Sequence, residues 1–230
     1  MTAEHLYAGF SADQVREAER PLLEAGEPLM ARAAAGLAAV VREVLAQRRG
    51  GPGRLLVLAG SGNNGGDALF AVAELLHDGG SATVVPLGAR LHEAGLAAAR
   101  SAGAAVLPAG AGVSDVLALA ASADVILDGI LGTGAAASPA LRPPASDVVA
   151  ALLPVVAAGT PVVAVDLPSG IGPDDGAVTG PVLPALITVT FGAVKAGLLL
   201  PPGRDLAGTV RLVDIGLGPR LADVEPLVRP

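Results

Sequence analysis

Three residues stand out as candidates for chemistry because their residue types are almost absent from this chain. Asn63 and Asn64, its only asparagines, are adjacent, and Lys195 is its only lysine, since fourteen of the fifteen Lys and Arg residues are arginines. Lysine is normally among the commonest residues. The abundance of Ala, Gly, Pro, Val and Arg indicates a GC-rich genome, which favours Arg over Lys and Gly, Asp or Ser over Asn. We therefore expect these three residues to occupy positions where no other side chain serves.

The asparagine pair lies in the segment Gly-Ser-Gly-Asn-Asn-Gly-Gly-Asp, residues 60–67, which satisfies the pattern G-x-G-x-x-G. The segment follows an expected strand and opens an expected helix, so its backbone N–H groups could bind a phosphate. A dinucleotide fold also needs an acidic residue at the end of the next strand, to bind the ribose. That strand ends at residues 85–88 without an acid, and no Gly-Lys-Ser/Thr sequence follows the loop. The usual NAD-binding and P-loop modes are therefore not supported, and a tight turn whose asparagines cap the helix is the structural alternative.

Three further segments place polar residues directly after expected strands. They are residues 128–134, residues 166–170 and the stretch that contains Lys195. We expect Asp128 to leave its strand and point into the crevice at the strand ends. Ligands of open parallel sheets bind at the carboxyl ends of the strands, so we expect these segments and the asparagine loop to form one site. A carboxylate at such a strand end is partly desolvated, which can raise its pKa toward catalytic usefulness. For Asp128 and Asp166, a structural role within their own turns is the alternative.

The side chains at these strand ends could bind a cation or move a proton. Asn64, Asp128 and Ser169 carry amide, carboxylate and hydroxyl oxygens, which hard cations prefer as ligands. A monovalent ion suits the small number of charges that converge there. Lys195 differs from an arginine because an ammonium group can titrate and can fit a small pocket, whereas a guanidinium always stays charged.

Composition limits the class of protein. Of the 230 residues, 52% are hydrophobic, with only three Phe, one Tyr and no Trp, so the core is built mainly from small aliphatic side chains. The net charge of -7 argues against nucleic acid binding through a broad basic surface. The absence of Cys excludes disulfides and thiolate sites. The three histidines, His5, His77 and His92, lack metal-ligand spacing, so we expect them to be solvated.

Targeting and domain signals are also missing. The first seven residues have neither a basic nor an apolar signal-peptide region, and no apolar run reaches membrane-spanning length. We expect a cytoplasmic protein with neither nucleic acid nor membrane as a partner. Residues 1–230 contain no repeat, low-complexity tail or clear boundary, which predicts a single domain.

Hydrophobic periodicity predicts the elements that position the site. A capping box at residues 11–14 opens a helix that Pro21 ends or bends, and a second helix runs from Pro28 to about Arg48. Strands are then expected at 55–58, 82–87, 104–107, 125–127 and 162–165, and helices at 65–77, 91–101, 114–121 and 146–158. Two more strands, 186–191 and 209–213, are joined by Gly- and Pro-rich loops without an obvious helix.

Alternation of strands and helices implies right-handed βαβ units and a mostly parallel sheet. The strands are continuous apolar runs, as expected when both faces of a sheet are covered. We therefore predict an α/β fold, a Rossmann-like three-layer αβα sandwich with a mostly parallel central sheet. The first fifty residues are expected to add an N-terminal helical layer.

Four ordered motifs together resemble the NAD(P)H-hydrate epimerase family, whose domain is of the YjeF N-terminal type. They are GSGNNGGD at 60–67, DGILGTG at 128–134, DLPSG at 166–170 and TFGAVKAGL at 190–198. The resemblance extends over nearly the whole chain, because the early segments FSADQ at 10–14 and LMARA at 29–33 also look like that family's N-terminal layer.

The resemblance implies a Rossmann-like fold, a dimer and an isomerase that interconverts the R and S epimers of hydrated NADH or NADPH. In these damaged cofactors a hydroxyl group has been added at C6 of the reduced nicotinamide. Epimerisation restores the form that a partner dehydratase repairs. Many bacteria fuse that dehydratase to this domain, and we expect it here in a separate gene or beyond the given sequence.

The resemblance also assigns residues. Asp166 would act at the nicotinamide, and Asn64, Asp128 and Ser169 would bind a potassium ion. Residues 63–67 and 132–138 would contact the hydrated cofactor. Within those two ranges the predicted substrate-binding residues are Asn63, Asn64, Gly65, Gly66, Asp67, Gly132, Thr133 and Gly134, together with Asp166 itself.

Our mechanistic hypothesis is acid–base-assisted loss and return of the C6 hydroxyl. The ring nitrogen expels hydroxide to give a planar, iminium-like carbon, which water attacks from either face while Asp166 shuttles the proton. Lys195, the second catalytic candidate, would position Asp166 or stabilise its carboxylate. Two alternatives stay open: a non-catalytic nucleotide-binding or scaffold domain of the same fold, and an ordinary NAD-dependent oxidoreductase, which the missing ribose acid disfavours.

Overall fold

Runs of Val, Leu, Ile and Ala form the centre of a seven-stranded sheet whose neighbouring strands are all parallel. The computed structural model describes residues 8–135 and 139–229. The strand order is β4-β3-β2-β5-β6-β7-β9. The strands are β2 (Arg54–Ala59), β3 (Ser81–Pro86), β4 (Ala105–Val106), β5 (Val125–Gly129), β6 (Val162–Val165), β7 (Ile187–Phe191) and β9 (Thr209–Val213). The predicted α/β fold with a mostly parallel sheet is therefore confirmed.

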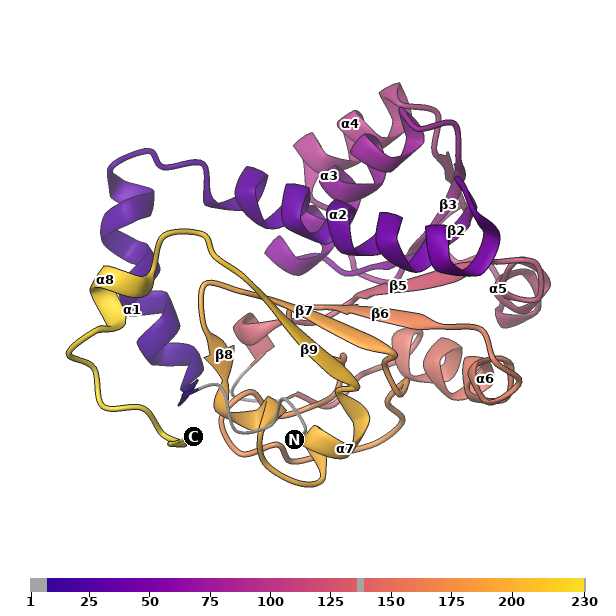
Figure 1. The fold of residues 1–230 in the computed structure, drawn as a ribbon. Helices are drawn as coiled ribbons and strands as arrows, with labels where there is room; N and C mark the ends of the chain where they lie inside the picture. Colours follow the sequence, from indigo (N-terminus) through magenta and orange to yellow (C-terminus); the bar gives the residue numbers. More distant parts are fainter. Residues whose placement is uncertain (1–7, 136–138, 230) are drawn as a thin grey trace.

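Helices cover both faces of the sheet (Figure 1). One layer contains α2 (Leu29–Arg49), α3 (Asn63–Leu76) and α4 (Glu93–Ser101), and the other contains α5 (Val113–Ala120) and α6 (Ala145–Ala157). Successive residues of a strand point to opposite faces. Leu55 and Val57 accordingly pack in the core beneath the first layer, and Leu56 and Leu58 pack in the core beneath the second. Burial on both faces explains why the strands read as uninterrupted apolar runs.

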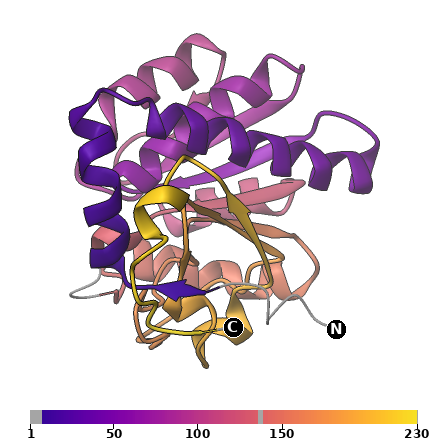
Figure 2. The same cartoon turned by 60° about the vertical axis from the view of Figure 1, so that its left-hand side comes forward.

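Helix α1 (Ala12–Glu24) stands at one end of the sheet, beside α8 (Gly218–Leu221) (Figure 2). The predicted capping box is present, because Ser11 Oγ accepts the Gln14 N–H at 3.1 Å and Gln14 Oε1 accepts the Ser11 N–H at 2.9 Å. The prediction that Pro21 could end this helix is wrong, since α1 continues to Glu24. Pro21 lies in the last turn, where its missing N–H removes one helical bond while its carbonyl still accepts from Ala25.

A second, two-stranded sheet, which the sequence did not predict, joins the N-terminal part of the chain to the segment that contains Lys195. Strand β1 (Gly9–Phe10) pairs in parallel with β8 (Val194–Lys195), with Phe10 opposite Lys195. A Cβ atom on Gly9 would lie 2.9 Å from the Ala196 Cα, so only glycine permits this close approach. The pairing sets the position of α1, which begins two residues after Phe10, relative to the lysine. Strands of two residues are too short to produce a periodic signal.

Short helices occupy loops that were predicted to be without helix. They are η3 (Ala196–Leu198) and α7 (Gly203–Leu206), and a further short helix, η2 (Thr133–Ala135), lies in the loop after β5. Within the described ranges, no helix is both long enough and apolar enough to cross a membrane.

Candidate functional site

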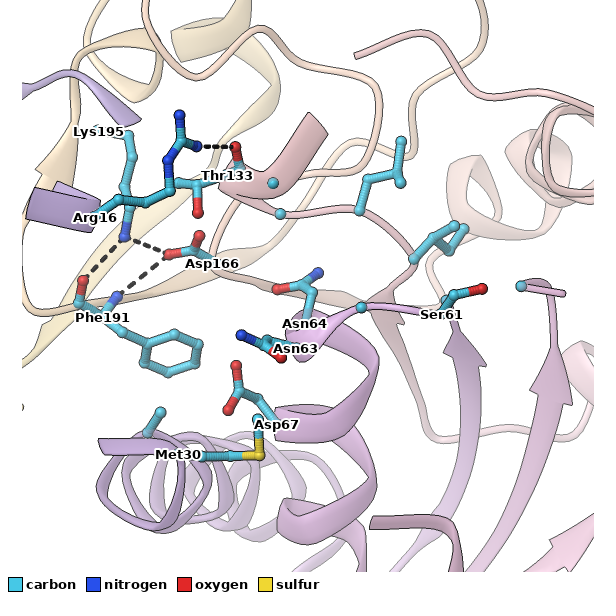
Figure 3. Close-up of a pocket in the computed structure, with 18 of the residues that line it drawn as sticks. Arg16, Met30, Ser61, Asn63, Asn64, Asp67, Thr133, Asp166, Phe191 and Lys195 are labelled. Atoms are coloured by element: carbon cyan, nitrogen blue, oxygen red, sulfur yellow. Dashed lines mark hydrogen bonds and ion pairs between the residues drawn. The ribbon is translucent and has the colours of Figure 1, made fainter. Parts of the chain in front are cut away.

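A pocket of about 900 Å³ opens at the carboxyl ends of the central strands. All four predicted segments contribute to its lining, through Asn63, Thr133, Asp166 and Lys195 among others. Helix α1 supplies a further wall with Arg16 and Glu19, and α2 supplies Met30 (Figure 3). The structure thus brings together, from distant parts of the chain, the segments that the strand-end argument predicted to meet.

Not every predicted residue lies on the pocket wall. Asn63, Asn64, Asp67, Gly132, Thr133 and Gly134 line it, whereas Gly65 and Gly66 are buried inside the first turn of α3. A Cβ on Gly65 would lie 2.3 Å from the Gly60 carbonyl oxygen, so this glycine lets the helix start close against its own loop. Residues 136–138 of the predicted 132–138 contact range lie outside the described residues.

Asp166 and Lys195 form a buried ion pair at one end of the pocket. The Lys195 Nζ donates to Asp166 Oδ1 at 2.5 Å and to the Phe191 carbonyl oxygen at 2.9 Å (Figure 3), and also to Thr190 Oγ1 at 3.1 Å. Asp166 is 6% exposed and Lys195 only 2%. An ammonium group has three donors, and all three have acceptors here. Lys195 therefore holds Asp166 in place and supplies its counter-charge, with no donor left over for a ligand.

The backbone of Asp166 is also unusual. Its φ of 67° is the only positive φ of a non-glycine residue in the described part of the chain. Aspartate tolerates this left-handed region better than most residues, but the conformation stores strain and is found most often at functional sites. The turn directs the carboxylate back toward β7 and β8, where Thr190 Oγ1 donates to it at 3.2 Å.

Asp67 occupies a very different environment from Asp166. It is 8% exposed and forms no hydrogen bond or ion pair with any residue in the described ranges. Burial, together with the nearby charges of Asp166 and Glu19 and against the opposing charge of Lys195, raises the pKa of Asp67 to about 8. Burial likewise raises the pKa of Glu19, with the charge of Lys195 acting in the other direction. A carboxyl group in this environment favours its neutral, protonated form near pH 7.

Asp128 and Ser169 form a buried polar cluster behind the pocket wall. Both are 1% exposed, and Ser169 donates to Asp128 through its hydroxyl at 2.6 Å and its backbone N–H at 2.8 Å. Burial raises the pKa of Asp128, while the hydrogen bonds from Ser169 and Ile130 lower it. The prediction that Asp128 leaves its strand and points into the crevice is wrong. It lies within β5, paired with Leu58 and Ala164, and does not line the pocket.

Asn64 is the remaining member of the predicted cation set, and its amide group is unsatisfied. The side chain is 8% exposed, and neither Oδ1 nor Nδ2 has a hydrogen-bond partner among the described residues. A buried amide without partners costs free energy, so a group that binds it is expected. A Cβ on Gly132 would lie 2.9 Å from Asn64 Oδ1, which shows that the amide oxygen lies against the loop that follows Asp128.

Sequence reasoning missed the contribution of α1. Arg16 donates to the Thr133 carbonyl oxygen at 3.1 Å and so links α1 to the loop after β5. No local pattern in the sequence places α1 here, because its position depends on the β1–β8 pairing. His92 was expected to be solvated, but it caps α4 by accepting the Gly95 N–H at 3.1 Å and packs edge-on against Phe70. His5 lies outside the described residues, and within them no cluster of three or more His, Asp or Glu side chains has the arrangement of a metal site.

Comparison with known proteins agrees with these motifs. The family model described as "YjeF-related protein N-terminus" matches residues 26–197. The chain belongs to this family. It is 52% identical over 225 residues to the "NAD(P)H-hydrate epimerase" of Clavibacter michiganensis subsp. michiganensis, covering 96% of this chain and 95% of that protein.

Two further relatives define the family context. The "Bifunctional NAD(P)H-hydrate repair enzyme Nnr" of Mycobacterium tuberculosis is 42% identical over 222 residues, which cover 94% of this chain but 43% of the longer protein. The crystal structure of yeast ynu0 matches with a TM-score of 0.70 and 24% identity, covering 82% of each chain. The structural match shows that the YjeF-related chain shares its fold with the yeast protein.

Replacement of Lys195 tests the importance of the buried ion pair. Lys195→Met leaves the Asp166 carboxylate buried without its counter-charge, so we expect the free energy of unfolding to fall by about 3–5 kcal/mol. Lys195→Arg keeps the charge but forces a larger group among the three acceptors, and a loss of about 1–3 kcal/mol is expected. Urea denaturation measures both. Arg211→Met, which removes an exposed ion pair with Glu43, serves as control and should cost at most about 1 kcal/mol. A Lys195→Met protein as stable as that control would contradict the account.

The protonation of Asp67 predicts a pH-dependent effect of Asp67→Asn on stability. The folded-state pKa of about 8 lies above the ordinary value of 3.8, so between these values the folded protein holds a proton that the unfolded chain has lost. The free energy of unfolding of the wild type therefore falls as pH rises through this window, by up to about 1.4 kcal/mol per pH unit. Asparagine does not titrate, so Asp67→Asn should gain stability relative to wild type from pH 5 to pH 8. Parallel pH–stability curves for the two proteins would show that Asp67 is not buried as a neutral acid.

Proposed function

We propose that this chain is an NAD(P)H-hydrate epimerase, an isomerase that interconverts the R and S forms of hydrated NADH and NADPH. The observation that carries the proposal is a strand-end carboxylate, Asp166, held by a buried lysine in the pocket of a chain that is 52% identical to a protein named for this activity. The substrate class follows from that name and from the four motifs.

The pocket has features that suit a reduced dinucleotide. Its volume of about 900 Å³ lies within the range of small-molecule and cofactor sites. Helix α3 begins at Asn63 without any side-chain cap, so the backbone N–H groups of its first turn are available to an anion. We place the pyrophosphate of the substrate there and the hydrated nicotinamide beside Asp166.

The proposed reaction is the loss and return of the C6 hydroxyl. The lone pair of the ring nitrogen expels the hydroxyl group, which leaves as water once it is protonated, and a planar iminium-like carbon results. A second water then attacks that carbon and gives up a proton. Asp166 transfers the proton, and Lys195 fixes the orientation of its carboxylate. Hydride transfer plays no part, which separates this activity from that of an oxidoreductase.

A potassium ion suits the oxygens of Asn64, which lines the pocket, and of Asp128 and Ser169, which lie behind its wall. Asn64 offers a buried amide oxygen without a partner, and Asp128 and Ser169 offer carboxylate and hydroxyl oxygens, which are donors that hard cations accept. When bound, the ion would supply a fixed positive charge beneath the phosphate-binding turn.

The remaining proposals concern partners and location. We infer a functional partnership with an NAD(P)H-hydrate dehydratase, which the name of the bifunctional mycobacterial relative supports. A homodimer and a cytoplasmic location rest on the family resemblance and on the sequence, and light scattering coupled to size-exclusion chromatography tests the dimer.

Asp166→Asn tests the proposed reaction. We expect the rate of epimerisation, measured by chiral chromatography of NADH hydrate, to fall by about 10²–10⁴-fold, the usual contribution of a general acid–base group. Asp214→Asn, at an exposed position outside the pocket, should keep the wild-type rate. Undiminished turnover in folded Asp166→Asn protein would rule out the role of Asp166. Binding of the hydrate by wild type without any turnover would instead indicate a non-catalytic binding domain.

Thermal unfolding in matched salts tests the potassium site. An ion that binds only the folded state raises the unfolding temperature as its concentration rises. We expect a higher midpoint in KCl than in choline chloride at equal ionic strength, and loss of that difference in Asn64→Ala. Asn63→Ala, which removes the neighbouring amide, should keep it. Equal midpoints for wild type in the two salts would refute the site.

A further inference from the structure

Inversion at C6 sets a geometric requirement. The hydroxyl group leaves from one face of the nicotinamide ring, and the water that produces the other epimer arrives on the opposite face. The leaving group needs a proton donor and the incoming water needs a proton acceptor. Asp166 Oδ1 accepts hydrogen bonds from Lys195 Nζ at 2.5 Å, Thr190 Oγ1 at 3.2 Å and the Phe191 N–H at 3.5 Å, so its carboxyl group is not free to move from one face to the other.

Asp67 provides a second carboxyl group in the same part of the pocket. It comes from the first turns of α3, whereas Asp166 follows β6. In the view of Figure 3 the Asp67 carboxyl lies above Met30, and Asp166 lies beyond the Asn63 side chain from it. Both residues line the pocket. Asp67 has no hydrogen bond or ion pair within the described ranges, so its carboxyl group is available to a ligand.

The two carboxyl groups lie in different electrostatic environments. Glu19 of α1 and Asp166 add negative charge near Asp67, and Lys195 of β8 adds positive charge, but burial dominates and raises the pKa of Asp67 to about 8. Asp166 instead shares a 2.5 Å ion pair with Lys195. Two carboxyl groups held in such different environments are typical of an acid and a base that work together.

We propose that Asp67 is a second catalytic residue, which transfers the proton on the face of the nicotinamide ring opposite to Asp166. This inference rests on the proposed epimerase function. In one direction the Asp67 carboxylic acid protonates the departing C6 hydroxyl, the C6–O bond breaks with its electron pair, and water leaves. The ring nitrogen lone pair forms the C=N bond of the iminium. Water then attacks C6 from the other side, its oxygen forms the new C6–O bond, and its proton passes to the Asp166 carboxylate.

The reverse reaction exchanges the two roles. After one turnover Asp67 is a carboxylate and Asp166 is protonated, which is the state required to convert the product epimer back. Exchange of a proton with solvent restores the starting state. Atoms and charge balance without an oxidant or another co-reactant, and each carboxyl acts on one face only.

Oxygen-18 water separates this arrangement from a mechanism in which Asp166 serves both faces. Each purified epimer of NADH hydrate is incubated in labelled water, and label at C6 and configuration are measured together by chiral chromatography and mass spectrometry. In Asp67→Asn we expect epimerisation to fall at least ~100-fold. Label should still enter the epimer whose hydroxyl faces Asp166, with retention of configuration.

Two companion variants make the test decisive. Asp67→Ala should lose epimerisation to the same extent and regain part of it with added formate, a small acid that can occupy the vacated position. Asp214→Asn should behave as wild type. An Asp67→Asn rate within about threefold of wild type would overturn the proposal, and so would equal loss of labelling and epimerisation in folded protein, since Asp67 would then only position the substrate. A wild-type protein that does not epimerise at all would refute the proposed function itself, which is a distinguishable outcome.

Discussion

The ion pair between Asp166 and Lys195 is the interaction on which the geometry of the site depends. Burying either charge alone would cost several kcal/mol, and the pair is tolerated because the ammonium finds three acceptors in fixed positions. Those acceptors come from the end of β6 and from the end of β7, which the sheet holds side by side. The same constraint explains why the chain uses its one lysine here, since a planar guanidinium could not meet three acceptors grouped around a single point.

The ion pair also links the catalytic region to the N-terminal part of the chain. Lys195 lies in β8, opposite Phe10 of β1, and α1 begins shortly after that strand. Helix α1 then contributes Glu19 and Arg16 to the pocket, and Arg16 reaches the loop after β5. A change at the lysine would therefore disturb the pocket wall as well as the carboxylate.

Much of the fold could be predicted from the sequence, because the strands are uninterrupted apolar runs and their ends carry the polar motifs. Which of the predicted residues line the pocket was harder to predict. Gly65 and Gly66 belong to the glycine-rich pattern, but they serve the packing of α3 and do not line the pocket. Asp128 was expected in the crevice, yet the strand extends past it and turns its carboxylate toward Ser169. The pKa of Asp67 depends on its burial and on the charges of Glu19, Asp166 and Lys195, which the fold brings together and no spacing in the sequence encodes.

We propose above all that the reacting carbon lies at Asp166, within a pocket whose phosphate-binding end is the start of α3. A crystal structure of the Asp166→Asn protein with bound NADPH hydrate tests this claim directly. We expect the C6 hydroxyl within hydrogen-bonding distance of the residue 166 side chain, the opposite ring face toward Asp67, and the pyrophosphate at the first turn of α3. A structure with the adenine at residue 166 and the nicotinamide at the other end of the pocket would contradict the account.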